Sequence, residues 1–147
     1  KNDRWLFYSA LWGIGTFFIM LFVSAWMIKL FPDAEPQTAT NLIMQAQGRW
    51  ESIAVILMVS ILAPFSEEFV FRGYIYHSLR AHKNIWFSVL ATSLMFGCMH
   101  YDLFRLLPLT LVGILLNIVS IRSQSLYGSM IMHGVWNFMM ASLVLAI

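Results

Sequence analysis

Between Arg4 and Lys29 the chain carries no charged residue, and most side chains in that stretch are apolar. An α-helix crosses the hydrocarbon core of a bilayer with about 20 apolar residues, so this stretch is long enough to span a membrane. The rest of the chain has the same character, since 60% of its 147 residues are hydrophobic and only 11% are charged. Soluble domains carry about 25% charged residues, and short chains bury a smaller fraction of their surface than long ones. The composition therefore indicates a membrane protein and excludes a soluble enzyme.

Two further counts limit the function. The formal net charge of +2 is too small to indicate a nucleic-acid partner. The only cysteine is Cys98, which excludes an intrachain disulfide and a multi-cysteine zinc site. The chain starts at Lys1 rather than at Met, and we therefore expect a longer precursor.

The apolar runs predict an all-α fold, a polytopic membrane helix bundle of about five transmembrane helices. The polar stretch from Phe31 to Arg49 is predicted to be a loop, and Pro64 is expected to kink the second helix. This divides the chain into an N-terminal transmembrane helix with its polar loop, residues 1–49, and a helical core, residues 50–147. The five predicted helices are Trp5–Leu30, Trp50–Leu79, Ile85–His100, Phe104–Ile121 and Leu126–Ile147.

Basic residues are unevenly divided between the two ends of the predicted bundle. One end has fewer of them, diluted by acidic side chains; the other holds Lys1, Arg4, Arg80, Lys83 and Arg122. Cytoplasmic loops of membrane proteins carry an excess of Lys and Arg. This predicts a multi-pass protein of a bacterial cell membrane with its N-terminus in the cytoplasm.

Ionisable and amide groups occur inside three of the predicted helices, where lipid should exclude them. A charge at the bilayer centre costs at least about 2.5–3.5 kcal/mol on insertion scales, so it usually marks a functional site. At 1.5 Å of rise per residue, Glu67 and the groups on the later helices lie roughly 16–22 Å from the cytoplasmic helix ends. We therefore expect one shared polar layer. Its members are Glu67, Glu68, Arg72, His100, His133 and Asn137.

The spacing of these groups separates their roles. Adjacent residues on a helix point about 100° apart, so Glu67 and Glu68 cannot serve the same purpose. Glu68 and Arg72 are four residues apart with the acid first, which predicts an internal ion pair. Glu67 is then the carboxylate without an obvious cation, which suits it to act as a general base or acid. His133 and Asn137 share one helix face, a pattern that by itself also suits interhelical hydrogen bonding.

Three motifs now stand in order along the chain. Residues 67–72 read EExxxR, residues 96–100 read FxxxH and residues 133–137 read HxxxN. In this order they resemble those of the CAAX protease and bacteriocin-processing (CPBP, or Abi) family of intramembrane glutamic endopeptidases. The similarity covers about residues 52–147, so the helical core looks like a CPBP catalytic core. The zinc-protease motif HExxH and the serine-hydrolase motif GxSxG are both absent.

The resemblance implies a role for each residue of the motifs. Glu67 and His100 would activate a water molecule, and His133 and Asn137 would stabilise the oxyanion. Glu68 and Arg72 would hold the first motif in shape, and Phe96 would pack beside the site. The resemblance further implies that the enzyme needs no metal and no other cofactor. Its partner in the bilayer would be a peptide or protein tail that is reached from the membrane.

Other interpretations of the same residues remain open. Glu67, His100 and His133 could instead bind zinc, since three protein ligands plus a water make a catalytic zinc site. The constellation could also be the polar packing core of a non-catalytic scaffold or bacteriocin-immunity protein. Buried Glu and His side chains also build the proton relays of proton-coupled carriers. The first helix lies outside the resemblance, and we expect it to pack at the edge and to contribute no catalytic group.

Overall fold

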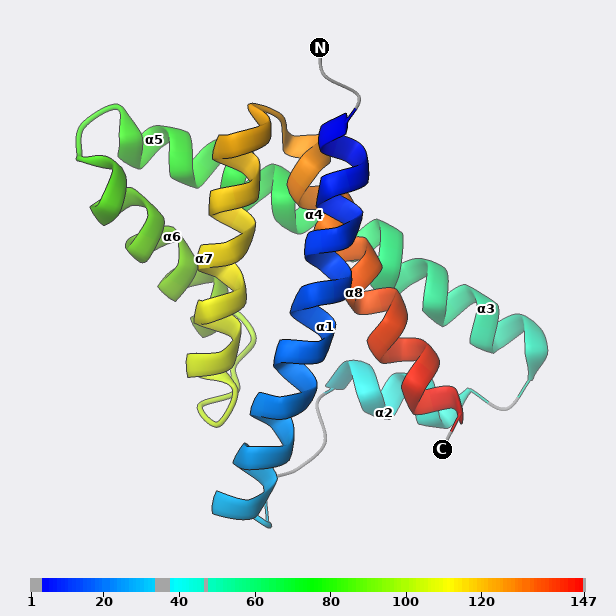
Figure 1. Ribbon diagram of the computed structural model, residues 1–147. Coiled ribbons are helices and arrows are strands. Elements are labelled where there is room, and N and C mark those ends of the chain that lie inside the picture. The colour runs from blue at the N-terminus through cyan, green and yellow to red at the C-terminus, as the bar shows by residue number, and fades with distance from the viewer. Residues whose placement is uncertain (1–3, 34–37, 47, 147) are drawn as a thin grey trace.

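The computed structural model describes residues 4–33, 38–46 and 48–146, and these residues form helices joined by turns (Figure 1). The all-α membrane bundle predicted from the sequence is confirmed. In chain order the helices are α1 (Arg4–Leu30), α2 (Thr38–Gln45), α3 (Arg49–Leu57), η1 (Met58–Leu62), α4 (Ala63–Glu68), η2 (Phe69–Ile75), α5 (Tyr76–Arg80), α6 (Ile85–Cys98), α7 (Leu106–Ser123) and α8 (Leu126–Ala146).

Four helical segments are long and apolar enough to cross a membrane in the described part of the chain. They are Arg4–Leu30, Arg49–Arg80, Leu106–Ser123 and Leu126–Ala146. The fifth predicted span, α6, is shorter and ends at Cys98. The sequence predicts that His100 lies on this helix. This is wrong, because His100 lies in the turn that follows α6.

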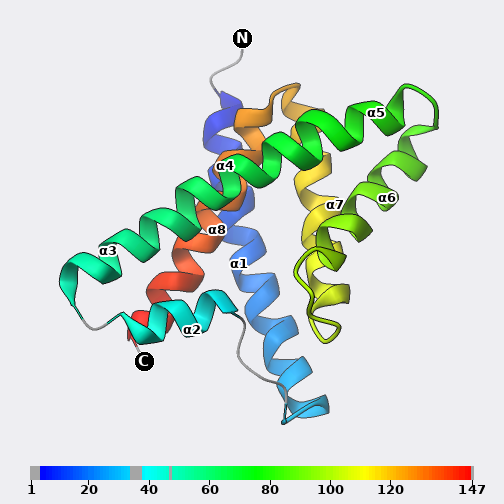
Figure 2. The ribbon, with the colours of Figure 1, turned by 180° about the vertical axis from the view of Figure 1, so that it is seen from behind.

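The second span is one continuous helix from Arg49 to Arg80, close to its predicted bounds (Figure 2). Within it, η1 and η2 are π-helical, which means that N–H groups reach back five residues instead of four. Pro64 is the second residue of α4 and lies two residues after the end of η1. A proline in a helix has no N–H to donate, so the regular hydrogen-bond pattern is interrupted next to it. The π-helical turn η1 lies at this interruption.

The predicted loop between the first two spans is wrong in part, because α2 forms within it. A helix of only two turns is marginal in water by itself, although the α2 segment is amphipathic. In the structure α2 packs against α8 and α3, with Ile43 buried. Its packing, rather than its own composition, accounts for the helix.

We expected α1 to pack at the edge, and one face of it is buried against the bundle while most of its large apolar side chains are exposed. α1 runs alongside α8, as Figures 1 and 2 both show, and Phe17 and Met20 join the buried core. The close approach depends on Gly13, where an added Cβ would lie 2.6 Å from the backbone oxygen of Met132.

The contact at Gly13 can be tested against a second glycine on the same helix. We expect Gly13→Ala to lower the free energy of unfolding by about 1–3 kcal/mol, because overpacking forces α1 away from α8. Gly15→Ala is the matched control, since nothing lies within 4 Å of an added Cβ there. Thermal unfolding in detergent would measure both variants. Equal midpoints for the two would contradict the close α1–α8 packing.

Candidate active site

The two adjacent carboxylates on α4 lie in different surroundings. The Glu68 side chain is completely buried and its Oε1 lies 2.8 Å from the Nη1 of Arg72, so the predicted ion pair is present. The Glu67 side chain is 31% exposed. Only Glu67 is therefore accessible to a molecule that enters from outside.

Arg72 anchors the buried pair to neighbouring helices. Its Nη2 donates to the carbonyl oxygen of Gly113 on α7, at 2.9 Å. Its guanidinium also lies over the ring of Phe96, 4.8 Å from the ring centroid. The carboxylate, the carbonyl and the aromatic face compensate the buried charge of Arg72, while Arg72 Nε and Glu68 Oε2 have no hydrogen-bond partner among the described residues.

His133 on α8 contacts both carboxylates. Its Nδ1 donates to Glu68 Oε1 at 2.9 Å, because a carboxylate oxygen can only accept. Its Nε2 lies 3.8 Å from Glu67 Oε2, which is too long for a direct hydrogen bond. Trp136 stacks on the imidazole, with 5.7 Å between ring centroids and 24° between ring planes. Glu68 and Trp136 together fix the ring so that Nε2 faces Glu67.

His100 is held by the end of α6. Its Nδ1 donates to the carbonyl oxygen of Phe96 at 2.8 Å, which leaves Nε2 as the ring nitrogen available to a ligand. The next residue, Tyr101, has a left-handed backbone with φ 51°, and the chain turns away there. Phe96 is fully buried and its ring lies against both histidines, with centroid distances of 4.9 Å to His100 and 5.8 Å to His133.

The connection from α6 to α7 is stabilised by an ion pair between Asp102 and Arg105. Asp102 also accepts a hydrogen bond from the backbone N–H of Arg105, at 3.0 Å. Partial burial alone would raise the pKa of Asp102, but the hydrogen bonds and the charge of Arg105 outweigh it and hold that pKa below its usual value. The pair is thus ionised at neutral pH and fixes the turn that follows His100.

Asn137 is positioned by the π-helical turn. In η1 the N–H of Ala63 donates to Met58 O, five residues back, so the next carbonyl, Val59 O, faces Pro64. Pro64 has no N–H and cannot bond to it. Asn137 Nδ2 donates to Val59 O instead, at 2.8 Å. A carbonyl that proline leaves without a helical donor therefore fixes one amide hydrogen of Asn137 and leaves the second for another acceptor.

The same helix crossing depends on Gly134. An added Cβ at Gly134 would lie 2.6 Å from the backbone oxygen of Ser60 in η1. No larger residue would let α8 approach η1 this closely. Gly134 lies between His133 and Asn137 in the HxxxN motif, so the motif also contains the residue that brings the two helices together.

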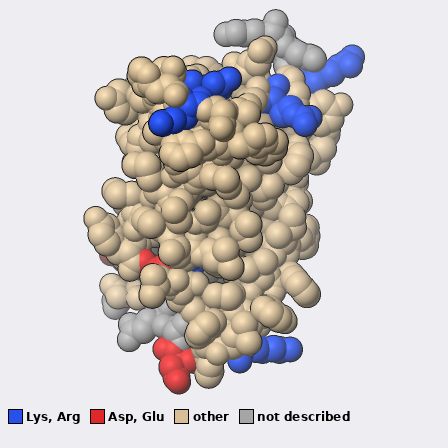
Figure 3. All heavy atoms as spheres, turned by 90° about the vertical axis from the view of Figure 1, so that its left-hand side faces the viewer, with Lys and Arg blue, Asp and Glu red and all other residues tan. Residues whose placement is uncertain are grey.

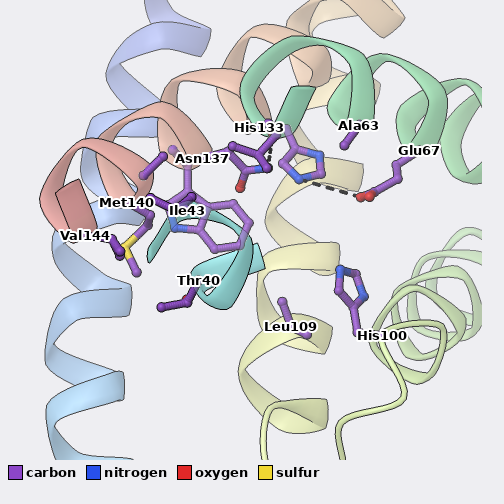
Figure 4. Close-up of a pocket in the computed structure, with 13 residues that line it drawn as sticks. Thr40, Ile43, Ala63, Glu67, His100, Leu109, His133, Asn137, Met140 and Val144 are labelled. Atoms are coloured by element: carbon purple, nitrogen blue, oxygen red, sulfur yellow. Dashed lines mark hydrogen bonds and ion pairs between the residues drawn. The ribbon is translucent and has the colours of Figure 1, made fainter. Parts of the chain in front are cut away.

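All four predicted catalytic residues line one cavity of about 280 Å³. Figure 4 shows Glu67 and His133 pointing toward one another, with His100 below them and Asn137 beside His133. The remaining wall is mostly apolar and comes from α2, the second span, α7 and α8; it includes Thr40, Ile43, Val59, Ala63, Leu109, Trp136, Met140, Ala141 and Val144. No α1 residue is among those that line this cavity.

The supporting residues lie directly behind this cavity. None of these three residues lines the cavity. Glu68 bonds to His133 and Arg72 bonds to Glu68. The ring of Phe96 contacts that of His100. A metal would need several donor side chains close together. In residues 4–33, 38–46 and 48–146, no three His, Cys, Asp or Glu side chains are grouped as such a site requires.

The comparison with protein families agrees with this geometry. Residues 49–139 match the family model described as "Type II CAAX prenyl endopeptidase Rce1-like". The chain belongs to this family. The match begins at the first residue of α3 and ends within α8, so it includes every residue of the three motifs.

Two curated relatives match this Rce1-like chain. It is 29% identical over 136 residues to the "Putative membrane peptidase YdiL" of Bacillus subtilis (strain 168), which covers 88% of the chain and 54% of the relative. It is 35% identical over 86 residues to the "Uncharacterized 24.3 kDa protein" of Escherichia coli, covering 55% of the chain and 40% of the relative. The chain thus spans about half the length of these relatives or less. No solved structure matches it.

The sequence did not reveal the roles of several residues in this Rce1-like site. Pro64 was expected to kink a helix, and its effect on Val59 was not foreseen. Gly134 and Trp136 lie inside the HxxxN motif, directly after His133 and directly before Asn137. Their residue types, a glycine and an aromatic residue, were the local signals of their packing roles. Thr40 and Ile43 lie in the segment predicted as a loop, and nothing local in the sequence pointed to them.

The link between Pro64 and Asn137 can be tested with a double-mutant cycle. Pro64→Ala restores an N–H that can donate to Val59 O, so Asn137 should then matter less. We expect Asn137→Ala to lower the free energy of unfolding by about 1 kcal/mol more in the wild-type background than in the Pro64→Ala background. Unfolding titrations in mixed detergent micelles would measure this difference.

Asn117 provides the control for this cycle. It is a buried asparagine on α7 whose Nδ2 donates to Gly113 O and to Ser93 Oγ, and neither of these partners belongs to η1. Asn117→Ala should lower the free energy of unfolding equally in both backgrounds. An equal loss for Asn137→Ala in both backgrounds would show that Val59 O is not the group that Asn137 satisfies.

Proposed function

We propose that this chain forms the catalytic core of an intramembrane glutamic endopeptidase that hydrolyses a peptide bond in a membrane-associated peptide or protein tail. One observation carries the proposal: Glu67, His100, His133 and Asn137 line a single cavity, and of the two adjacent carboxylates only Glu67 is exposed to it. Membership of the Rce1-like family and the similarity to a relative named as a membrane peptidase support the same reaction class.

In the proposed reaction Glu67 is the general base. It accepts a proton from a water molecule, whose oxygen attacks the peptide carbonyl carbon and forms a tetrahedral intermediate. His100 assists through Nε2, the ring nitrogen that its bond to Phe96 O leaves available. As the intermediate collapses, the carbon–nitrogen bond breaks and Glu67 returns the proton to the leaving amine.

Asn137 and His133 are the proposed oxyanion donors. Asn137 has one amide hydrogen on Val59 O and therefore one to give to the developing negative charge. In the proposed reaction the His133 ring carries a proton on both nitrogens, so that Nε2–H donates to the oxyanion while Nδ1–H stays on Glu68. Donors held in place before the reaction stabilise the transition state without having to reorganise, and in a low-dielectric site this contribution is large.

The proposed substrate reaches the site from the bilayer, and no metal or other cofactor takes part. An apolar wall made by Ile43, Met140 and Val144 next to polar catalytic groups suits a peptide with apolar side chains near the cleaved bond. The excess of basic residues at the end that carries Arg80 and Arg122 supports a cytoplasmic N-terminus in a bacterial cell membrane.

The direct experiment measures turnover of a peptide library by the purified protein in detergent. Matched prenylated and unprenylated peptides should be included, and Glu67→Ala serves as the inactive control. Cleavage that disappears in Glu67→Ala supports the proposal. A folded protein that cleaves no peptide in either set would favour a non-catalytic scaffold, in which the same polar groups only pack the bundle.

The two carboxylates should respond oppositely to the same substitution. Glu67→Gln removes the proton acceptor and should lower turnover by at least 10²–10⁴-fold, roughly what general-base catalysis contributes, with little change in the unfolding midpoint. Glu68→Gln removes the charge that faces Arg72 and should lower the free energy of unfolding by up to about 3–5 kcal/mol. Kinetics and thermal unfolding of the two purified variants would measure both effects.

The opposite pattern would overturn this assignment. It would consist of a stable but inactive Glu68→Gln protein beside an active Glu67→Gln protein. Glu67→Asp serves as a further control, because it keeps the carboxylate but draws it back from the water, and it should retain more activity than Glu67→Gln.

The metal-independent reaction can be tested by removing metals. Activity should be unchanged after treatment with EDTA or phenanthroline, since the proposed base and oxyanion donors are all side chains of this chain. Metal analysis of the purified active protein provides the second measurement. Stoichiometric zinc that is lost together with activity, and restored with it, would establish the zinc interpretation of Glu67, His100 and His133 instead.

A further inference from the structure

A second polar cavity lies at the opposite end of α8 from the cavity of the proposed active site. It has a volume of about 420 Å³ and is enclosed by the end of α5, the end of α7 and the start of α8. Two candidate spans end here, at Arg80 and at Ser123, and a third begins at Leu126. Where three spans reach their ends together, the surrounding bilayer presents its headgroups and not its hydrocarbon. We therefore expect the cavity to lie near the depth of the lipid phosphates.

The residues that line this cavity include one permanent cation, Arg80, and several polar side chains beside the apolar Ile121 and Leu126. Arg80 and His77 of α5 line it, together with the hydroxyl-bearing residues Ser120 and Ser125 and the side-chain amide of Gln124. No Asp or Glu is among the lining residues. Arg80 Nη1 donates to the carbonyl oxygen of Lys83 at 3.0 Å, and no carboxylate pairs with Arg80 among its described contacts. Since a guanidinium has five N–H donors in a planar fork, most of them are available to an anion.

The wider surface has the same sign of charge. On the face drawn in Figure 3, most Lys and Arg side chains gather at the end of the molecule that carries the α5–α6 connection, while at the opposite end basic side chains occur together with Asp and Glu side chains. Lys83 and Arg122 are neighbours of the cavity in the sequence but do not line it. They raise the local concentration of anions without defining where an anion binds.

We propose that this cavity binds a phosphate group, with Arg80 as its principal donor. The source is either the headgroup of an anionic phospholipid or a free phosphate. Arginine pairs with phosphate through two parallel N–H···O bonds, and basic pockets between transmembrane helices are typical sites for anionic headgroups. The inference does not depend on the proposed peptidase activity, because none of these residues lines the cavity that holds Glu67.

The test measures the thermal unfolding midpoint of the purified protein in a neutral maltoside detergent. Short-chain phosphatidylglycerol, short-chain phosphatidylcholine and inorganic phosphate are added in separate arms. For a ligand at about a hundredfold excess over its Kd, the midpoint of a chain of this size should rise by roughly 5–10 °C. Each variant is compared with its own ligand-free midpoint, so that a change in its basal stability does not affect the result.

Arg80→Gln should abolish the rise, and Arg122→Gln is the matched control. Arg122→Gln removes the same charge from the same end of the molecule but not from the cavity, and it should keep the rise. A rise with phosphatidylglycerol alone that depends on Arg80 assigns a lipid headgroup, whereas the same rise with inorganic phosphate assigns a soluble phosphate. Equal behaviour of the two variants, or no rise in any arm, would overturn the proposal. If Arg80→Gln does not fold, Arg80→Lys replaces it, with a reduced rise expected because lysine lacks the planar fork.

Discussion

A single oxygen, Oε1 of Glu68, accepts hydrogen bonds from Arg72 at 2.8 Å and from His133 at 2.9 Å in the interior of the bundle. Removing one member of a buried ion pair leaves an uncompensated charge, so each member constrains the others. Arg72 also bonds to Gly113 on α7, and His133 belongs to α8. The second, third and fourth spans are therefore tied together at this carboxylate. The orientation of His133, and with it the shape of the cavity, therefore depends on Glu68, although Glu68 does not line the cavity.

The crossing of α8 with the second span adds a constraint that acts through the backbone. Gly134 allows the helices to approach, and Pro64 leaves Val59 O without a helical donor where Asn137 can reach it. A free carbonyl in a membrane helix is tolerated only when a neighbouring helix satisfies it. At the crossing where His133 faces Glu67, Asn137 hydrogen-bonds to Val59 O. Both residues therefore lie on the same face of α8, which their four-residue spacing provides.

The sequence was most informative where interactions are local. Long apolar runs predicted the four spans, and the four-residue spacing of Glu68 and Arg72 predicted their ion pair. The depth of the polar groups predicted one shared layer, but not which distant residues pair within it: His133 meets Glu68 across 65 positions, and no local pattern encodes that contact. The helix α2 was not predicted for a related reason: a helix of two turns is marginal by itself and is stabilised here by the packing of Ile43. His100 was misplaced because its helix ends at Cys98, before the residue that the motif names.

The two cavities lie at different depths along α8, and this bears on how a substrate would reach Glu67. With 1.5 Å of rise per residue, His133 lies roughly 11 Å from the start of α8 and Val144 roughly 27 Å from it. The cavity that holds Glu67 thus extends from the interior toward the end of the bundle where α2 packs, away from the basic end at Arg80 (Figures 1 and 4). Water cannot cross the apolar helices, so in the proposed reaction it must arrive along this extension. The packing of α2 against α8 then has a proposed role, because Thr40 and Ile43 of α2 form part of the wall past which this water would move.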